Sequence, residues 1–514
     1  MASNQQIEAA WEYHDGTKHS YWSVRESTHT LDFSNYPLPF KIYQGLEPIP
    51  LPREGPPLAL PALAAIADRG SGPAEERIPD LPALAATLHL SAGITRERRA
   101  GGEGVQFRAA ACTGALYHVE LYLVCGDLPG LPAGVYHFGV HDSALRRLRA
   151  GDYRAVLVEA TGSEPAVAAA PAVIVCTSTY WRNAWKYQAR TYRHCFWDTG
   201  TILANLLAAA AAQRLPARLV LGFVDETLNR LLDLNSEREV ALAVVPLGCT
   251  RVPHPPASPP VTPLGLPFAP YSRDEVDYPP IRAMHAASSL TSGEEAAAWR
   301  GGTPPGDPPA AAGRTIALQP LSDADVPADS VADVILRRGS TRRFGHQAIS
   351  FSQLSTLLDR ATRGVPADFL DPPGATLNAL YLIVNAVDGL PPGTYVYHRA
   401  LRALEPLREG RFRREAGHLG LEQDLPADAS VNVYFLTDLA SVLARFGNRG
   451  YRAAQVEAGI LGGKCYLAAY AQGFGATGLT FYDDDVTEFF SPHARGRSVM
   501  FLTAFGHPTR RRST

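Results

Sequence analysis

The chain has 514 residues, of which 46% are hydrophobic and 19% charged, and its formal net charge is −3 at pH 7. This length exceeds what one ordinary core supports, so we expect two large domains. The near-neutral charge argues against a general nucleic-acid-binding protein, which would carry a basic excess. The six cysteines form no CxxC pair, so we expect no zinc site, no dithiol redox motif and no other metal.

The start of the chain gives no targeting signal. Residues 1–13 are polar and contain no apolar run, so we expect no signal peptide. The longest apolar stretch, near residues 203–212, is too short and too rich in alanine to span a bilayer. These features predict a cytoplasmic protein without a membrane segment.

Residues 1–54 are aromatic and polar, and prolines crowd their second half. This composition predicts an extended N-terminal arm that wraps the protein. Residues 55–250 follow as a first domain with short β-rich segments bounded by Gly or Pro. Its expected elements are strands near 121–124, 135–138 and 173–176 and a long buried helix over 191–213.

Residues 251–312 are so rich in proline and glycine that they predict a linker or a surface-hugging belt. Residues 313–514 form the second expected domain. Alternating helices and short strands indicate an α+β or three-layer α/β fold. The expected elements are helices over 331–338, 352–363 and 451–472 and strands near 381–384, 394–397 and 499–505.

The two domains repeat one another. PGLPAGVYHFGV at 129–140 matches DGLPPGTYVYHR at 388–399, and RTYRHCFWDTG at 190–200 matches NRGYRAAQVEAG at 448–459. The paired positions Gly134 and Gly393, Tyr192 and Tyr451, and Gly200 and Gly459 are each 259 residues apart. One register held over this span predicts two copies of one fold, arranged as a pseudo-dimer within the chain.

Two motifs of the second copy suit a cofactor. Arg338, Ser340 and Arg342 alternate, so an extended backbone places two guanidiniums and a hydroxyl on one side, which suits a phosphate monoester. A solvated basic helix end is the alternative. The segment GFGATGLT at 473–480 can present backbone N–H groups to a ring edge, or it is a plain glycine helix cap.

Two motifs of the first copy complement them. ACTGALY at 111–117 places small residues before a strand, where backbone can approach a planar ligand, although a plain turn would read the same way. Lys186 and Tyr187 have Arg445 and Phe446 at the matching positions of the second copy. Lys and Tyr can exchange protons, whereas Arg and Phe cannot act as a base near neutral pH. The alternative is a basic-aromatic surface pair.

Together these segments resemble the FMN-dependent nitroreductase superfamily, and within it the SagB/ThcOx-type azoline dehydrogenases, which oxidise thiazolines and oxazolines in ribosomal peptide natural products. The similar segments are YHDGTKHSYWSVR with LDFSNYPLPFKIY in the arm, LHLSAGITR with FRAAACTGALYHVELYLV in the first copy, and the helices RTYRHCFWDTGTILANL and YRAAQVEAGILGGKCYLAA.

The resemblance implies an α+β fold of two tandem nitroreductase-like domains, each with a central antiparallel-rich sheet, and FMN at their interface. It also implies that Lys186 and Tyr187 act in azoline oxidation. The implied cofactor contacts are Arg338, Ser340 and Arg342 at the phosphate, Cys112, Thr113, Gly114, Ala115 and Leu116 over the flavin, Gly478, Leu479 and Thr480 along the ring, and Arg510 among the arginines 510–512.

The chain departs from the family pattern in three places. It has Ala111-Cys112 where Pro-Ser is common and His118 where Pro is common. The first copy has no Arg-x-Ser-x-Arg motif, since residues 65–78 read AIADRGSGPAEERI. We therefore predict one FMN per chain, with its phosphate in the second copy.

The function implied is oxidation of a peptide-borne or carrier-bound azoline ring to an azole, with hydride transfer to FMN N5, proton transfer by the Lys-Tyr pair and reoxidation by O₂. A cyclodehydratase is the candidate partner, and a further homodimer is compatible with the sequence. The alternatives are an NAD(P)H-dependent nitro- or quinone-reductase, and a flavin-free scaffold that binds a precursor peptide or partner enzymes.

Overall fold

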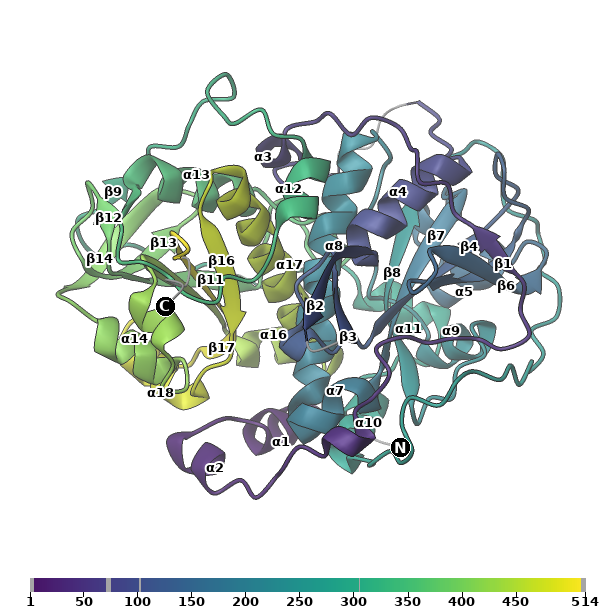
Figure 1. Cartoon of the computed structure of the whole chain (residues 1–514), viewed down its shortest axis with the longest axis horizontal. Helices are drawn as coiled ribbons and strands as arrows, with labels where there is room; N and C mark the ends of the chain where they lie inside the picture. Colours follow the sequence, from purple (N-terminus) through teal and green to yellow (C-terminus); the bar gives the residue numbers. More distant parts are fainter. Residues whose placement is uncertain (1–3, 71–74, 101–102, 305, 510–514) are drawn as a thin grey trace.

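The computed structural model describes the chain except residues 1–3, 71–74, 101–102, 305 and 510–514. Two lobes lie side by side, each with a sheet and flanking helices (Figure 1). The first sheet has the order β1-β6-β5-β4-β7-β8 and is antiparallel throughout. Its strands are β1 (Pro48–Pro50), β4 (Val119–Cys125), β5 (Gly134–Gly139), β6 (Ala144–Ala150), β7 (Ala172–Thr179) and β8 (Glu239–Leu247).

The second sheet has the order β16-β17-β15-β11-β13-β14-β9 and is also antiparallel. Its strands are β9 (Ile316–Ala317), β11 (Asn378–Val384), β13 (Gly393–His398), β14 (Ala403–Glu409), β15 (Val431–Thr437), β16 (Gly475–Leu479) and β17 (Ser498–Gly506). Two short ribbons lie outside these sheets, formed by β2 (Ile94–Ala100) with β3 (Glu103–Arg108) and by β10 (Ile349–Ser350) with β12 (Val387–Asp388).

The repeat read from the sequence is a repeat of structure. Strands β6-β5-β4-β7-β8 correspond in order to β14-β13-β11-β15-β17. The register breaks between Val135 and Tyr136 in one sheet and between Thr394 and Tyr395 in the other, 259 residues later. The Tyr136 and Tyr395 hydroxyls each donate to a proline carbonyl four residues upstream. The predicted α+β fold with two tandem domains is therefore confirmed.

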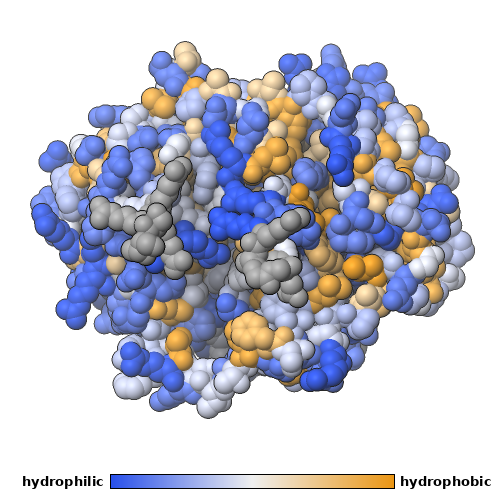
Figure 2. Space-filling model, in the orientation of Figure 1, coloured by the Kyte–Doolittle hydropathy of each residue, from blue (hydrophilic) through white to orange (hydrophobic). Residues whose placement is uncertain are grey.

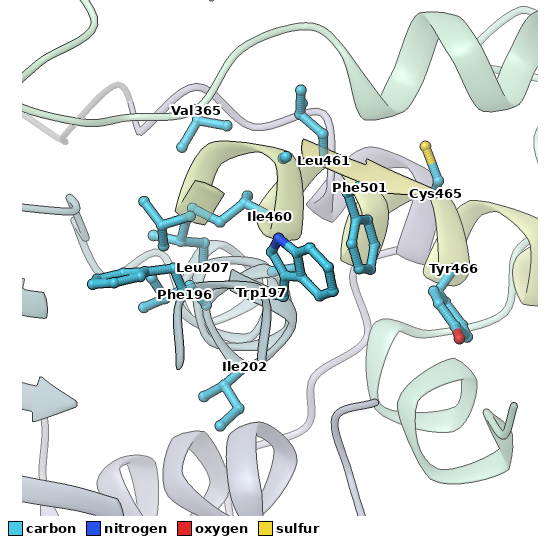
Figure 3. Close-up of a cluster of buried hydrophobic side chains, with 14 of the residues drawn as sticks. Phe196, Trp197, Ile202, Leu207, Val365, Ile460, Leu461, Cys465, Tyr466 and Phe501 are labelled. Carbon is cyan, nitrogen blue, oxygen red and sulfur yellow. The ribbon is translucent and has the colours of Figure 1, made fainter. Parts of the chain in front are cut away.

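Two long helices, α8 (Thr191–Ala212) and α17 (Arg449–Ala471), cross at the centre. They meet at the paired glycines, since a Cβ on Gly200 would lie 2.6 Å from the Gly459 backbone. Only glycine allows this approach. Side chains of both helices pack around the crossing, among them Trp197, Leu207, Ile460 and Tyr466 (Figure 3).

Ion pairs across the two domains follow the same symmetry. Arg190, which immediately precedes α8, and Arg193 of α8 pair with Asp483, the first residue of α18. The equivalent Arg449 and Arg452 of α17 pair with Asp225, the first residue of α9, at 2.6 Å each. Reciprocal contacts of this kind define an isologous interface, here formed within one chain.

The remaining helices surround these elements. In the first domain they are α3 (Ala62–Ala65), α4 (Leu81–Ala92), α5 (Arg154–Ala160), α6 (Pro165–Ala168), α7 (Tyr180–Tyr187) and α9 (Asp225–Leu231). In the second they are α12 (Val331–Arg337), α13 (Phe351–Ala361), α14 (Arg413–Leu419), α15 (Asp424–Asp428), α16 (Leu439–Phe446) and α18 (Asp483–Phe489). The stretch 180–212 is long and apolar enough to cross a membrane, but 89% of its window is buried in the core.

The arm and the linker are more structured than their composition predicts. The arm, expected to be extended, contains the helices α1 (Glu8–Gly16) and α2 (Tyr21–Arg25), because its prolines begin only at position 37. The linker contains α10 (Pro279–Ala287) and α11 (Gly293–Trp299), which bury Ile281, Met284 and Trp299. Both segments pack against the interface between the domains, where the His14 carbonyl accepts from Arg193.

Candidate active site

A cavity of about 290 Å³ lies between the two domains and collects most of the expected site residues. The first domain contributes the segment 112–115 and the α7 residues Lys186 and Tyr187. The second contributes Ser340, Arg342 and the β16 end at 478–480. Leu116 does not line this cavity but packs in an aromatic cluster with Trp181 and Trp185. Arg510 lies outside the described residues.

A smaller cavity of about 130 Å³ adjoins the first, and Cys112, Ser340 and Arg342 line both. No aspartate or glutamate is among the described residues that line it, whereas five arginines are. Positive charge without a carboxylate partner suits a phosphate. The five are Arg96, Arg98, Arg108, Arg338 and Arg342.

Arg338 and Arg108 are the two members of this set that are recorded as buried. Arg338 is oriented by the opposite domain. Its guanidinium donates to the carbonyls of Ala109 at 2.9 Å and Arg108 at 3.2 Å. Burial lowers the pKa of Arg338, but a guanidinium stays charged at neutral pH. Arg342, by contrast, is exposed and forms no ion pair with any described residue. It is therefore free to contact a ligand.

Sequence reasoning missed three of the five arginines. Arg96 and Arg98 lie on β2, and Arg108 ends β3. The sequence pattern that could have revealed Arg96 and Arg98 is the alternation of arginine in ITRERRA, which places both side chains on one face of a strand. Since this ribbon belongs to the first domain, its approach to Arg338 could not be read from local sequence.

The segment at 112–117 is held in a strained shape against the cavity. Asp198 of α8 accepts from the Thr113 backbone N–H at 3.0 Å and from its hydroxyl at 2.8 Å. Gly114 has φ 64°, and a Cβ there would lie 2.8 Å from the Tyr187 hydroxyl. Glu457, the counterpart of Asp198, plays the same part in the second domain, where its carboxylate accepts a hydrogen bond from the Leu377 backbone N–H.

Lys186 and Tyr187 end α7 and lie at the cavity. The Lys186 side chain is exposed, with its Nζ 5.2 Å from the centre of the Tyr187 ring. Burial, followed by the charge of Asp198, raises the pKa of Tyr187. The phenol therefore keeps its proton at neutral pH and serves as a hydrogen-bond donor.

His194 also lines the cavity, although no role was predicted for it from the sequence. Burial, followed by the charge of Arg190, lowers its pKa, so the imidazole is neutral at pH 7. Nδ1 lies 2.8 Å from the Asn183 amide oxygen, an acceptor, which leaves Nε2 as the acceptor of the ring. The ring packs edge-on against Tyr187, with centroids 4.6 Å apart. The second domain has Ala453 at this position.

Within the glycine segment at 473–480 of the second domain, Gly475–Leu479 form the strand β16. Its Gly478 N–H already donates to the Tyr466 hydroxyl, which lies 3.3 Å from Ser340 Oγ. The Thr480 hydroxyl oxygen, however, is buried and has no hydrogen-bond partner among the described residues. An unpaired buried hydroxyl on a cavity wall is an open position for a ligand.

The profile of the nitroreductase family matches residues 103–249 and 335–507, one segment in each domain. The chain belongs to the nitroreductase family. Two similar proteins each carry the name "putative nitroreductase". MJ1384 of Methanocaldococcus jannaschii is 25% identical over 165 residues, which cover 32% of this chain and 78% of that protein. A crystal structure from Anabaena variabilis is 27% identical and covers 98% of this chain and 99% of its own, with a TM-score of 0.77.

Members of the nitroreductase family typically bind flavin, and the residues of this chain fit one. The arginine-lined cavity suits the phosphate of FMN, and the adjoining cavity has an aromatic wall of Trp197, Tyr466 and Phe501 for a planar ring. Arg342 and the Thr480 hydroxyl remain available to such a ligand.

The pseudo-symmetric position in this chain is different. A cavity of about 230 Å³ is lined by Ala217 and by Leu207, the counterpart of Tyr466. It also contains the buried Lys464, whose pKa burial lowers to about 8 and whose Nζ donates to the Gly364 carbonyl at 2.7 Å. The described residues that line it include one arginine, Arg214. This cavity lacks the arginine set that suits a phosphate.

Proposed function

We propose that this nitroreductase-family oxidoreductase binds one FMN per chain and oxidises azoline rings, carried by a peptide or a carrier, to azoles. One observation carries the proposal. Lys186 and Tyr187 of the first domain line the same cavity as Ser340 and Arg342 of the second, beside a cavity rich in arginine.

The residues that would hold FMN come from both domains. Arg338, Ser340 and Arg342 would bind the phosphate together with the arginines of the β2-β3 ribbon, and the segments 112–115 and 478–480 would enclose the ring. Bound FMN would supply the redox step by taking the hydride that leaves the azoline ring.

The protein's own groups would provide orientation and the proton acceptor. Tyr187 keeps its proton and would donate a hydrogen bond to the substrate, because its pKa is raised by burial. Lys186 would accept the ring proton on Nζ as the neutral amine, because an ammonium has no lone pair. Its side chain lies at the open side of the cavity. The neutral His194, packed against Tyr187, would keep the phenol in place.

The test uses the purified full-length protein. We expect one FMN per chain and oxidation of a thiazoline-containing peptide with consumption of O₂. Lys186→Ala should keep the flavin but lose oxidation, Lys186→Arg should not restore it, and Tyr187→Phe should retain part of the rate. A Lys186→Ala variant with an unchanged rate would refute the assignment of the base, and a ratio of two FMN per chain would refute the composite site.

The names of the relatives favour a second candidate function, NAD(P)H-dependent reduction of nitro compounds or quinones. Steady-state turnover of NADPH with a nitroaromatic compound, compared with turnover of the azoline peptide, separates the two. A cyclodehydratase that co-purifies with the protein would support the azoline assignment.

A further inference from the structure

Three potential metal ligands converge behind the segment 112–117. They are the thiol of Cys112, the imidazole of His118 and the carboxylate of Asp198, whose ligand atoms all lie within 4.8 Å of one another. Cys112 Sγ is 3.1 Å and His118 Nε2 is 2.9 Å from the same oxygen, Asp198 Oδ2. The mechanism above uses none of these three atoms.

The spacing is close to what a tetrahedral ion requires. Zn²⁺ binds sulfur at about 2.3 Å and nitrogen or oxygen at about 2.0–2.1 Å, so tetrahedral ligand atoms lie about 3.3–3.6 Å apart. The two measured separations need to open by a few tenths of an ångström, and the Cys112 sulfur lies within 4.8 Å of the His118 ring nitrogen. Rotation of the three side chains would bring the ligand atoms to the distances that the ion requires.

Each ligand also has a partner that fixes its orientation. His118 Nδ1 lies 2.8 Å from the Ser178 hydroxyl, which itself lies 3.3 Å from Cys195 Sγ. The Tyr117 backbone N–H donates to Cys112 Sγ at 3.1 Å. Thr113 holds the other carboxylate oxygen of Asp198. Metal-binding histidines and carboxylates are usually oriented in this way by neighbouring hydrogen bonds.

The charges and donor types identify the ion. A thiolate, a carboxylate and a neutral imidazole carry a net charge of two negatives, which a divalent cation neutralises. Sulfur, nitrogen and oxygen donors together suit Zn²⁺.

We propose that Cys112, His118 and Asp198 form a Zn²⁺ site in the wall of the cavity. His118 is fully buried, whereas Cys112 and Asp198 line the cavity, so the fourth ligand would come from the cavity side. Binding would release the thiol proton of Cys112, and the remaining imidazole proton would reside on Nδ1, hydrogen-bonded to Ser178. The expectation of no metal site rested on the missing CxxC pair. These ligands lie at positions 112, 118 and 198, so no local motif reveals them.

The test measures metal content and does not depend on flavin or turnover. The purified full-length protein is incubated with Zn²⁺, dialysed and analysed by mass spectrometry for zinc, and its affinity is measured by competition with a chromophoric chelator. We expect one Zn²⁺ per chain. Substitution with Co²⁺ should give a thiolate-to-cobalt charge-transfer band.

Four variants identify the site. Cys112→Ser and His118→Gln should lose the bound ion, and Cys112→Ser should also lose the charge-transfer band. Ser178→Ala should weaken binding by about 10–100-fold, as is usual when a partner of a metal-binding histidine is removed. Cys249→Ser, at a distant and partly exposed thiol, should bind like the wild type. A wild type without zinc, or equal binding by the Cys112 and Cys249 variants, would overturn the proposal.

Discussion

Arg342 gives the sharpest test of the phosphate site. It lines both cavities, is exposed and pairs with no carboxylate among the described residues, so its removal leaves no buried group unsatisfied. Hydrogen bonds to charged groups contribute about 1.5–3 kcal/mol. Because Arg342 is exposed and therefore screened by solvent, we take the lower end of this range. The Arg342→Ala variant should then bind FMN about tenfold more weakly.

The assay is a titration of the flavin-free protein with FMN, followed by quenching of flavin fluorescence. Arg343→Ala is the matched control, because Arg343 is the exposed neighbour of Arg342 and lines neither cavity. The control should bind FMN like the wild type, and both variants should unfold at the wild-type temperature. Equal affinity of the two variants would refute the reasoning and exclude Arg342 from the phosphate site.

Three further predictions concern the interface and the cavity. Asp483→Asn leaves the buried Arg190 and Arg193 without a full counter-charge and should destabilise the protein by up to about 3–5 kcal/mol in thermal or denaturant unfolding. Asp484→Asn, on the surface, should have little effect. Burial alone would raise the pKa of Asp225, but its arginine partners outweigh burial and lower the pKa to about 2. The ion pairs of Asp225 therefore stabilise the fold above about pH 4 and are lost as the pH falls toward 2, so the unfolding temperature should fall over this range. This fall should be smaller in the Asp225→Asn variant. Gly114→Ala should cost about 1–2 kcal/mol of backbone strain and displace the Tyr187 hydroxyl, 2.8 Å from the new Cβ, so oxidation should fall while the protein stays folded.

The sequence repeat predicted the fold well because its paired residues make equivalent packing contacts in the two domains. Gly200 and Gly459 are paired in the sequence, and in the structure they touch at the crossing of α8 and α17. The long helices and the main strands lie within a few residues of their predicted bounds. The helices in the arm and linker were missed because composition reports the average of a segment, and the prolines there lie outside α1 and α11.

The site was predictable only where its residues form local motifs. The alternation of Arg338, Ser340 and Arg342 and the Lys186-Tyr187 pair are visible in the chain, and the structure places them around adjoining cavities. The β2-β3 arginines and the hydrogen bonds of Asp198 depend on which elements meet in space, which spacing does not encode. Nor does sequence give the environment of a side chain, and it is burial that keeps Tyr187 protonated.

Symmetry is kept in this chain where it supports packing and is lost where it supports chemistry. The ion pairs of Asp225 and Asp483 with the two long helices are equivalent, and each domain needs its pair to bury those arginines. The two cavities are not equivalent: one adjoins the arginine set, and the other has Leu207 in place of Tyr466 and the buried Lys464. In a homodimer a substitution alters both sites at once, whereas in a fused chain each domain can change alone. In the proposed function, the fusion would allow one domain to specialise in phosphate binding and the other in proton transfer, which is the physical reason to expect one flavin per chain.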